Sequence, residues 1–179
     1  VEIAKGESIP IKTVWTREED IQGGFYRPMA THLIKAGLDA TGMPVGWQQR
    51  VVAQSMMAGT PFEQHIKDGV DHLSVEGAID MAYAIADRRI ELHGPTLPVS
   101  VLWWRSVSHT HTAFAGESFV DEIAHASGQD PFTLRQKLLQ DQPRHLQVLK
   151  LAAKKAGWGI PPKAGRAQGI AIRQSFGSY

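Results

Sequence analysis

Apolar residues at every second position, on both sides of a short turn, constrain the fold of this chain more than any other feature of its sequence. The alternation runs through residues 34–38 and again through residues 45–51, and the turn between them, residues 40–43, contains a glycine. Successive side chains of a strand point to opposite faces, so this period places the apolar side chains of each segment on one face. The pattern predicts a β-hairpin.

Capping signals predict two short helices in the first half of the chain. Thr16 and Glu19 are spaced as in a capping box, where each side chain bonds the other residue's backbone amide. Residues 60–63, Thr-Pro-Phe-Glu, form a second box with proline at the first helical position. We therefore expect a helix after Thr16 and another over residues 61–68.

Helical periodicity returns in the second half of the chain. Apolar residues recur three and four apart from residue 112 onwards, and two Pro signals follow. The three predicted helices begin near residue 112, at Pro131 and at Pro143, and they end near Gly128, Gln140 and Gly157. These helices follow the strands instead of alternating with them.

Three further segments are strand-like, namely residues 88–92, 99–103 and 169–176. The predicted class is α+β, a β-hairpin and mixed strands packed with several short helices. Because the chain begins at Val1 and stops directly after a predicted strand, we expect residues 1–179 to be a single α+β domain excised from the middle of a longer polypeptide.

The composition excludes several classes of function. A hydrophobic content of 42% is enough for a core, and a formal net charge of +1 gives no field that would favour nucleic acid. No apolar run reaches the roughly 18 residues that a membrane span needs. With no cysteine in the sequence, disulfides, thiolate metal sites and iron–sulfur ligation are excluded within this chain.

The densest candidate chemistry lies in residues 103–112, Trp-Trp-Arg-Ser-Val-Ser-His-Thr-His-Thr, which lead from a predicted strand into a predicted helix. A polar turn before a helix offers unpaired backbone amides to an anion, and Arg105 adds a donor for phosphate or carboxylate. In the alternative interpretation, Ser108 and Thr112 cap the helix and Arg105 pairs with an acid.

Other candidate residues give weaker signals. His109 and His111 share one face only if their backbone is extended, and no third ligand lies at a convincing spacing, which leaves a small histidine metalloprotein as a minor alternative. Glu117 and Asp121 lie one helical turn apart, and we expect them to complement the helix dipole or to pair with a neighbouring arginine rather than to catalyse. The glycines form neither a P-loop nor a dinucleotide fingerprint. A second alternative is a non-catalytic protein-interaction module that uses exposed tryptophans and a lysine-rich helix.

Short stretches along most of the chain carry a family resemblance. In order, they are residues 15–20, 25–28, 83–85, 105–109, 117–124, 130–131 and 169–171. Together they resemble the molybdopterin-binding large subunit of the xanthine dehydrogenase and aldehyde oxidase family. The branch they resemble most is that of the isoquinoline 1-oxidoreductase beta subunit and the membrane-associated aldehyde dehydrogenases.

The resemblance implies a fragment of a molybdenum-cofactor-binding domain. It implies that Trp104, Arg105, Ser106, Val107 and Ser108 help to hold molybdopterin cytosine dinucleotide, and it assigns no catalytic or metal-ligating residue to this chain. Xanthine-oxidising members carry Arg-Gly-Phe-Gly-Gly-Pro-Gln at this turn. Side chains here replace glycines, so the contacts after the arginine differ from those of such members.

The resemblance also implies an activity for the complete protein, the oxidation of an aldehyde or N-heterocycle with water as the oxygen source. Ser74 and Glu76 stand where purine-oxidising members place an arginine, which argues against a purine. The catalytic glutamate motif of the family is absent from these residues, so we expect the isolated chain to be inactive. The implied partners are an iron–sulfur small subunit and, in this branch, a cytochrome c. The implied location is periplasmic or membrane-associated.

Overall fold

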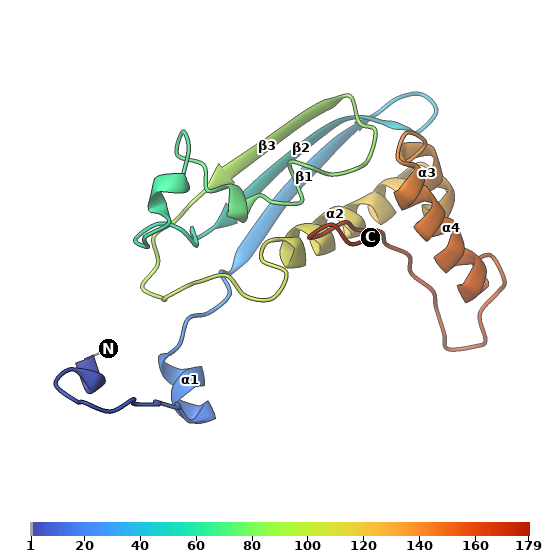
Figure 1. Cartoon of the computed structure of the whole chain (residues 1–179). Coiled ribbons are helices and arrows are strands. Elements are labelled where there is room, and N and C mark those ends of the chain that lie inside the picture. Colours follow the sequence, from blue (N-terminus) through green and yellow to red (C-terminus); the bar gives the residue numbers. More distant parts are fainter. Residues whose placement is uncertain (1) are drawn as a thin grey trace.

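The computed structural model describes residues 2–179 and confirms the α+β class. The chain order of the elements is η1 (Glu2–Ala4), α1 (Arg17–Gly23), β1 (Ala30–Leu38), β2 (Pro44–Ala53), η2 (Glu63–His65), η3 (His72–Ser74), β3 (Asp87–His93), α2 (His109–Ala126), α3 (Pro131–Leu138) and α4 (Pro143–Ala156). Figure 1 shows one sheet with α2 running beneath it, α3 and α4 beyond one end, and α1 in a segment that lies away from the sheet.

The predicted hairpin is confirmed as β1 and β2, paired antiparallel, and β3 adds to β2 in parallel. Asp39 fixes the turn because its carboxylate accepts from the amides of Thr41 at 2.8 Å and Met43 at 3.0 Å. Along β2 the residues Trp47, Gln49, Val51 and Ala53 are buried, as the alternation predicts, whereas Val45 at the start of the strand is 46% exposed. The sheet therefore presents one face to a core.

The core lies between that sheet face and α2. Its buried members are Trp47, Tyr83, Ile85, Val120, Ile123, Ala124, Leu134, Leu138, Leu139 and Leu149. They come from the sheet, from α2 and from the helix pair α3 and α4, so the hairpin and the helices share one cluster. Burying a side chain of this size stabilises a fold by roughly 1.5–3 kcal/mol. The part of α2 around residues 120–124 is thereby held against the sheet.

The helix signals of the sequence are mostly confirmed. Thr16 forms the predicted capping box with Glu19, and Asp130 accepts from the amide of Thr133 at 2.8 Å to start α3. Gly157 ends α4 in the left-handed region, at φ +66°. Helix α2 begins at residue 109, three residues before the apolar periodicity, because polar residues fill its first turn. No described helix has the length and apolar character needed to cross a membrane.

Three predicted elements are wrong. Residues 61–68 form only the 3-10 turn η2, and Asp68 and Gly69 both have positive φ, which ends any helix there. Residues 99–103 make a single bridge, from Val101 to Tyr26, instead of a strand. Residues 169–174 have no regular secondary structure, Phe176 lies in a turn bridged by Ser175 and Ser178, and the segment pairs with no strand of the sheet; Ile170 and Ile172 pack against the core instead. An apolar alternation signals burial of one face, and helices can supply that burial as well as a sheet.

Candidate functional site

The predicted turn of residues 104–108 is a tight, unusual bend immediately before α2. The amide of Val107 donates to the carbonyl of Trp104 at 2.8 Å and closes the bend. Ser106 and Val107 have φ of +65° and +46°, in the left-handed region that β-branched residues rarely adopt. Conformations of this kind cost about 1–3 kcal/mol each and persist only where neighbouring contacts enforce them.

Arg27 supplies those contacts. Its guanidinium donates to the carbonyl of Arg105 at 2.6 Å, to the carbonyl of Val107 at 2.9 Å and to the hydroxyl of Thr110 at 2.9 Å. Three charge-assisted bonds to one bend are strong enough to offset its strain. Sequence analysis missed this role, since a side chain about eighty residues upstream leaves no local signal.

Ser108 occupies the N-cap position of α2, but neither its side chain nor that of Thr112 makes a capping bond to a helix amide, so the first part of the capping alternative is wrong. Ser108 is fully buried, and its hydroxyl donates to the carbonyl of Leu73 instead of accepting from a helix amide. Thr112 donates to the carbonyl of Glu76 at 2.9 Å. Both hydroxyls therefore tie the start of α2 to the segment around η3.

Arg105 does not pair with an acid, so the second part of that alternative is also wrong. Its side chain is exposed, and none of the ion pairs among the described residues includes it. Among the same residues, nothing accepts a hydrogen bond from the amides of Ser106 and Ser108. Trp104 is 59% exposed beside them. A guanidinium, unpaired amides and a flat aromatic surface together suit an anionic or pterin-like group.

The two histidines of this region point to different partners. His111 Nδ1 lies 2.9 Å from His32 Nε2, whereas His109 lies 3.6 Å from Glu76 and receives a 3.4 Å bond from Arg173. Among residues 2–179, no group of three or more potential ligand side chains could hold a metal ion.

A buried relay fixes the protonation of the His32–His111 pair. Trp47 Nε1 donates to Gln49 Oε1 at 3.1 Å, which turns the Gln49 amide nitrogen towards His32 Nδ1 at 2.9 Å. His32 must then carry its proton on Nε2 and donate it to His111. Burial lowers the pKa of His32, and burial with the charges of His32 and Arg27 lowers the pKa of His111 to about 4. Both rings are neutral at pH 7.

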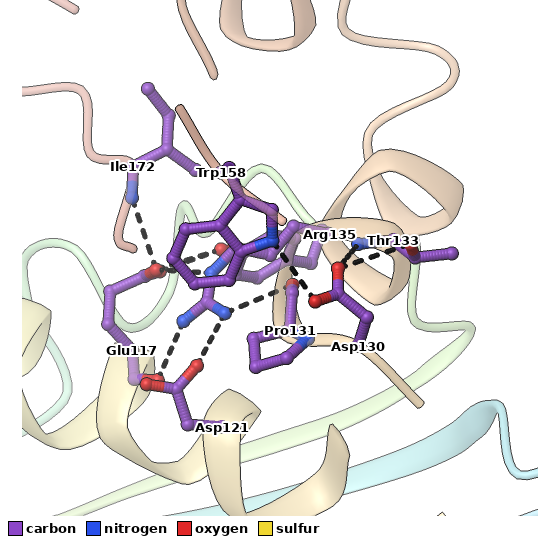
Figure 2. A network of polar contacts seen from close by, with 9 residues as sticks. Glu117, Asp121, Asp130, Pro131, Thr133, Arg135, Trp158 and Ile172 are labelled. Carbon is purple, nitrogen blue, oxygen red and sulfur yellow. Dashed lines mark hydrogen bonds and ion pairs between the residues drawn. The ribbon is translucent and has the colours of Figure 1, made fainter. Parts of the chain in front are cut away.

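Glu117 and Asp121 pair with an arginine, as the sequence suggested. Figure 2 shows the Arg135 guanidinium between the two carboxylates, with Glu117 also approached by the amide of Ile172. Tyr83 donates to Glu117 at 2.9 Å, and burial with the Glu117 charge raises the pKa of Tyr83. The members of this network have partners within the fold, and the network joins α2 to α3.

Solved oxidoreductases share this fold. The chain superposes on quinoline 2-oxidoreductase from Pseudomonas putida 86 with a TM-score of 0.64 and 17% identity, covering 80% of this chain and 20% of that structure. It superposes on the aldehyde oxidoreductase of Desulfovibrio gigas with a TM-score of 0.57 and 18% identity, covering 79% and 17%. The fold of this chain is thus that of one segment of these larger structures.

The sequence then specifies the family. The model of the molybdopterin cofactor-binding domain matches residues 3–139. This chain belongs to that family, and the resemblance stated from its motifs is confirmed.

Curated relatives are much longer than this chain. The membrane-bound aldehyde dehydrogenase [pyrroloquinoline-quinone] of Gluconacetobacter polyoxogenes is 31% identical over 76% of this chain and 18% of its own length. The isoquinoline 1-oxidoreductase subunit beta of Brevundimonas diminuta is 28% identical over 83% of this chain and 19% of its own length. The chain spans about a fifth of these two relatives.

Proposed function

We propose that this chain is part of the large subunit of a molybdenum hydroxylase and that its turn before α2 binds the molybdenum cofactor. The family match across residues 3–139 carries the proposal. The turn is the part of the described chain where an exposed guanidinium, unpaired amides and an exposed indole meet. Those groups fit an anionic, planar ligand, so the chemistry of the site agrees with the family.

The proposed binding residues are Trp104, Arg105, Ser106, Val107 and Ser108. Arg105 would contact a phosphate or the pterin directly, and the amide of the exposed Ser106 would donate to the same group. Ser108 and Val107 would contribute indirectly. The buried side chain of Ser108 and the left-handed conformation of Val107 would fix the direction of the backbone in the turn. The cytosine dinucleotide form of the cofactor is supported by the resemblance to the isoquinoline-oxidising branch.

The bound cofactor would supply two-electron oxidation of the substrate, and the chain would supply binding and orientation. The names of the relatives support an aldehyde or an N-heterocycle as the substrate. The subunit label of one relative supports a partner subunit, for which we propose an iron–sulfur protein and, as a further electron acceptor, a cytochrome c. The membrane-bound relative supports a periplasmic or membrane-associated location.

The test is the cofactor content of the complete protein that carries this chain. Arg105→Ala should lower molybdenum and released cytidine monophosphate per polypeptide. Arg89→Ala, which removes another exposed guanidinium, should leave both at the wild-type level. The name of one relative includes pyrroloquinoline quinone, so that cofactor is measured in the same samples.

Two results would contradict the proposal. Stoichiometric pyrroloquinoline quinone without molybdenum would show that the protein binds this quinone and not the molybdenum cofactor. An unchanged molybdenum content in Arg105→Ala would show that the cofactor does not bind at this turn. A complete protein that binds a protein partner and contains neither cofactor would favour the interaction module instead.

A further inference from the structure

Arg27 lies in a segment that the proposed function does not use, yet it contacts the proposed site more than any other side chain does. It belongs to the stretch Phe25-Tyr26-Arg27-Pro28, and Pro28 is buried. All three bonds of its guanidinium end in residues 105–110. Its side chain is only partly exposed, so the guanidinium is directed into the molecule.

Backbone pairing delivers Arg27 to this position. The amide of Tyr26 donates to the carbonyl of Ser100 at 3.0 Å, and the amide of Leu102 donates to the carbonyl of Tyr26 at 3.1 Å. The Tyr26–Val101 bridge thus aligns the Arg27 segment with the segment that leads into the turn. This pairing holds the backbone on both sides of the contact. Less conformational entropy is therefore lost when the Arg27 side chain forms its hydrogen bonds.

The charge of Arg27 is not neutralised by an acid. None of the ion pairs among the described residues includes Arg27, and its bonds go to two carbonyls and one hydroxyl. The Arg27 guanidinium donates to the carbonyl oxygens of Arg105 and Val107, so both carbonyls point towards Arg27. The Ser106 amide and the Arg105 side chain are left for a ligand on the outer side of the bend.

We infer that Arg27 is a positioning residue that holds the 104–108 turn in its cofactor-binding conformation. It acts through the backbone carbonyls of the turn and does not itself touch the cofactor. The inference rests on the proposed function. In addition, the forked geometry of the arginine side chain, and not its positive charge alone, keeps Ser106 and Val107 at positive φ.

The experiment uses the complete protein with Arg27→Lys and Arg27→Gln. Lysine keeps the charge and loses the fork, and glutamine loses the charge. Hydrogen exchange of amides 104–110 and molybdenum per polypeptide are measured for each variant. Arg50→Lys is the matched control, because Arg50 pairs with Glu91 on the sheet.

In Arg27→Lys we expect the amide of Val107, which donates to Trp104 in the bend, to exchange at least about tenfold faster, since the loss of one charged hydrogen bond suffices for that factor. Molybdenum content should fall, while the amides of Val120 and Ile123 keep their protection and show that the core is folded. Guanidinium ion added to Arg27→Ala should restore part of the protection.

Unchanged exchange in Arg27→Lys overturns the inference, whatever the molybdenum content. Faster exchange with normal molybdenum overturns it too, provided that Arg105→Ala loses molybdenum. If the turn loosens in Arg27→Lys and molybdenum stays normal in both variants, the proposed function of the turn fails instead. The inference about cofactor binding then fails with it.

Discussion

Arg135 donates from Nε to Glu117 Oε2 at 3.0 Å, and the arginine side chain has no exposed surface at all. The same guanidinium donates to the Glu117 carbonyl at 2.9 Å and to Asp121 at 2.6 Å. Burial opposes the Arg135 charge, but Tyr83, Glu117 and Asp121 outweigh burial, and the pKa of Arg135 is raised. The pair joins α2 to α3 (Figure 2).

Arg135→Leu should destabilise the chain by about 3–5 kcal/mol, because it leaves the buried Glu117 carboxylate without its counter-charge. Urea unfolding measures the loss. Arg50→Leu, which breaks a partly exposed pair with Glu91, should cost less than about 1 kcal/mol. The double variant Arg135→Leu with Glu117→Leu should cost clearly less than the sum of the two single changes. Additive costs would show that the two groups are not coupled.

The His32–His111 pair should make stability depend on pH. Unfolded histidine titrates near pH 6.5, at about the ordinary value. The pKa of His32 is lowered, and that of His111 is lowered to about 4. The unfolded chain therefore binds more protons between pH 6.5 and 4, so stability is full above that window and falls as the pH falls through it.

His111→Phe should flatten that pH dependence, because it removes the imidazole with the lowest folded pKa. His125→Phe on the same helix is the control, since His125 is exposed and lies outside the relay. Stability is measured by urea unfolding from pH 8 to pH 4. If the free energy of unfolding fell equally steeply with pH in wild type and in His111→Phe, the claim that the two folded histidines are neutral would be wrong.

Local signals in the sequence predicted the elements whose stabilising contacts are themselves local. The hairpin could be predicted because the alternation of apolar residues, together with the turn that Asp39 closes, sets its register. Asp130 and Gly157 mark helix ends through contacts within a few residues. The segment 169–176 was misassigned because its apolar residues pack on helices, which the same alternation permits.

The candidate site divides in the same way. The turn and Arg105 were found from composition and position, since a polar bend before a helix is visible locally. Arg27 and His32 were not found, because each reaches the site from about eighty residues away. Their roles depend on the pairing of Tyr26 with Val101 and on the packing of α2 beneath the sheet, which a single sequence does not reveal.

Gly116→Ala should stabilise the chain by about 0.5–1 kcal/mol. Glycine in a helix interior carries an entropic cost of that size relative to alanine. Gly116 lies inside α2, and a Cβ there would meet nothing within 4 Å. The increase is measured as a shift of the urea midpoint with unchanged m-value. A lower midpoint would show that α2 packs more tightly at this position than its open surroundings indicate.

Gly77→Ala and Gly59→Ala should separate backbone strain from crowding. Both glycines have positive φ, +86° at Gly77 and +73° at Gly59. A Cβ at Gly59 would meet nothing within 4 Å, so Gly59→Ala should cost only the backbone penalty of about 1–2 kcal/mol. A Cβ at Gly77 would overlap the Arg173 guanidinium and lie 2.6 Å from Thr112 Oγ1. Gly77→Ala should therefore cost more than Gly59→Ala and should loosen the first turn of α2, which hydrogen exchange at residues 109–112 detects; equal costs would mean that Arg173 moves aside freely.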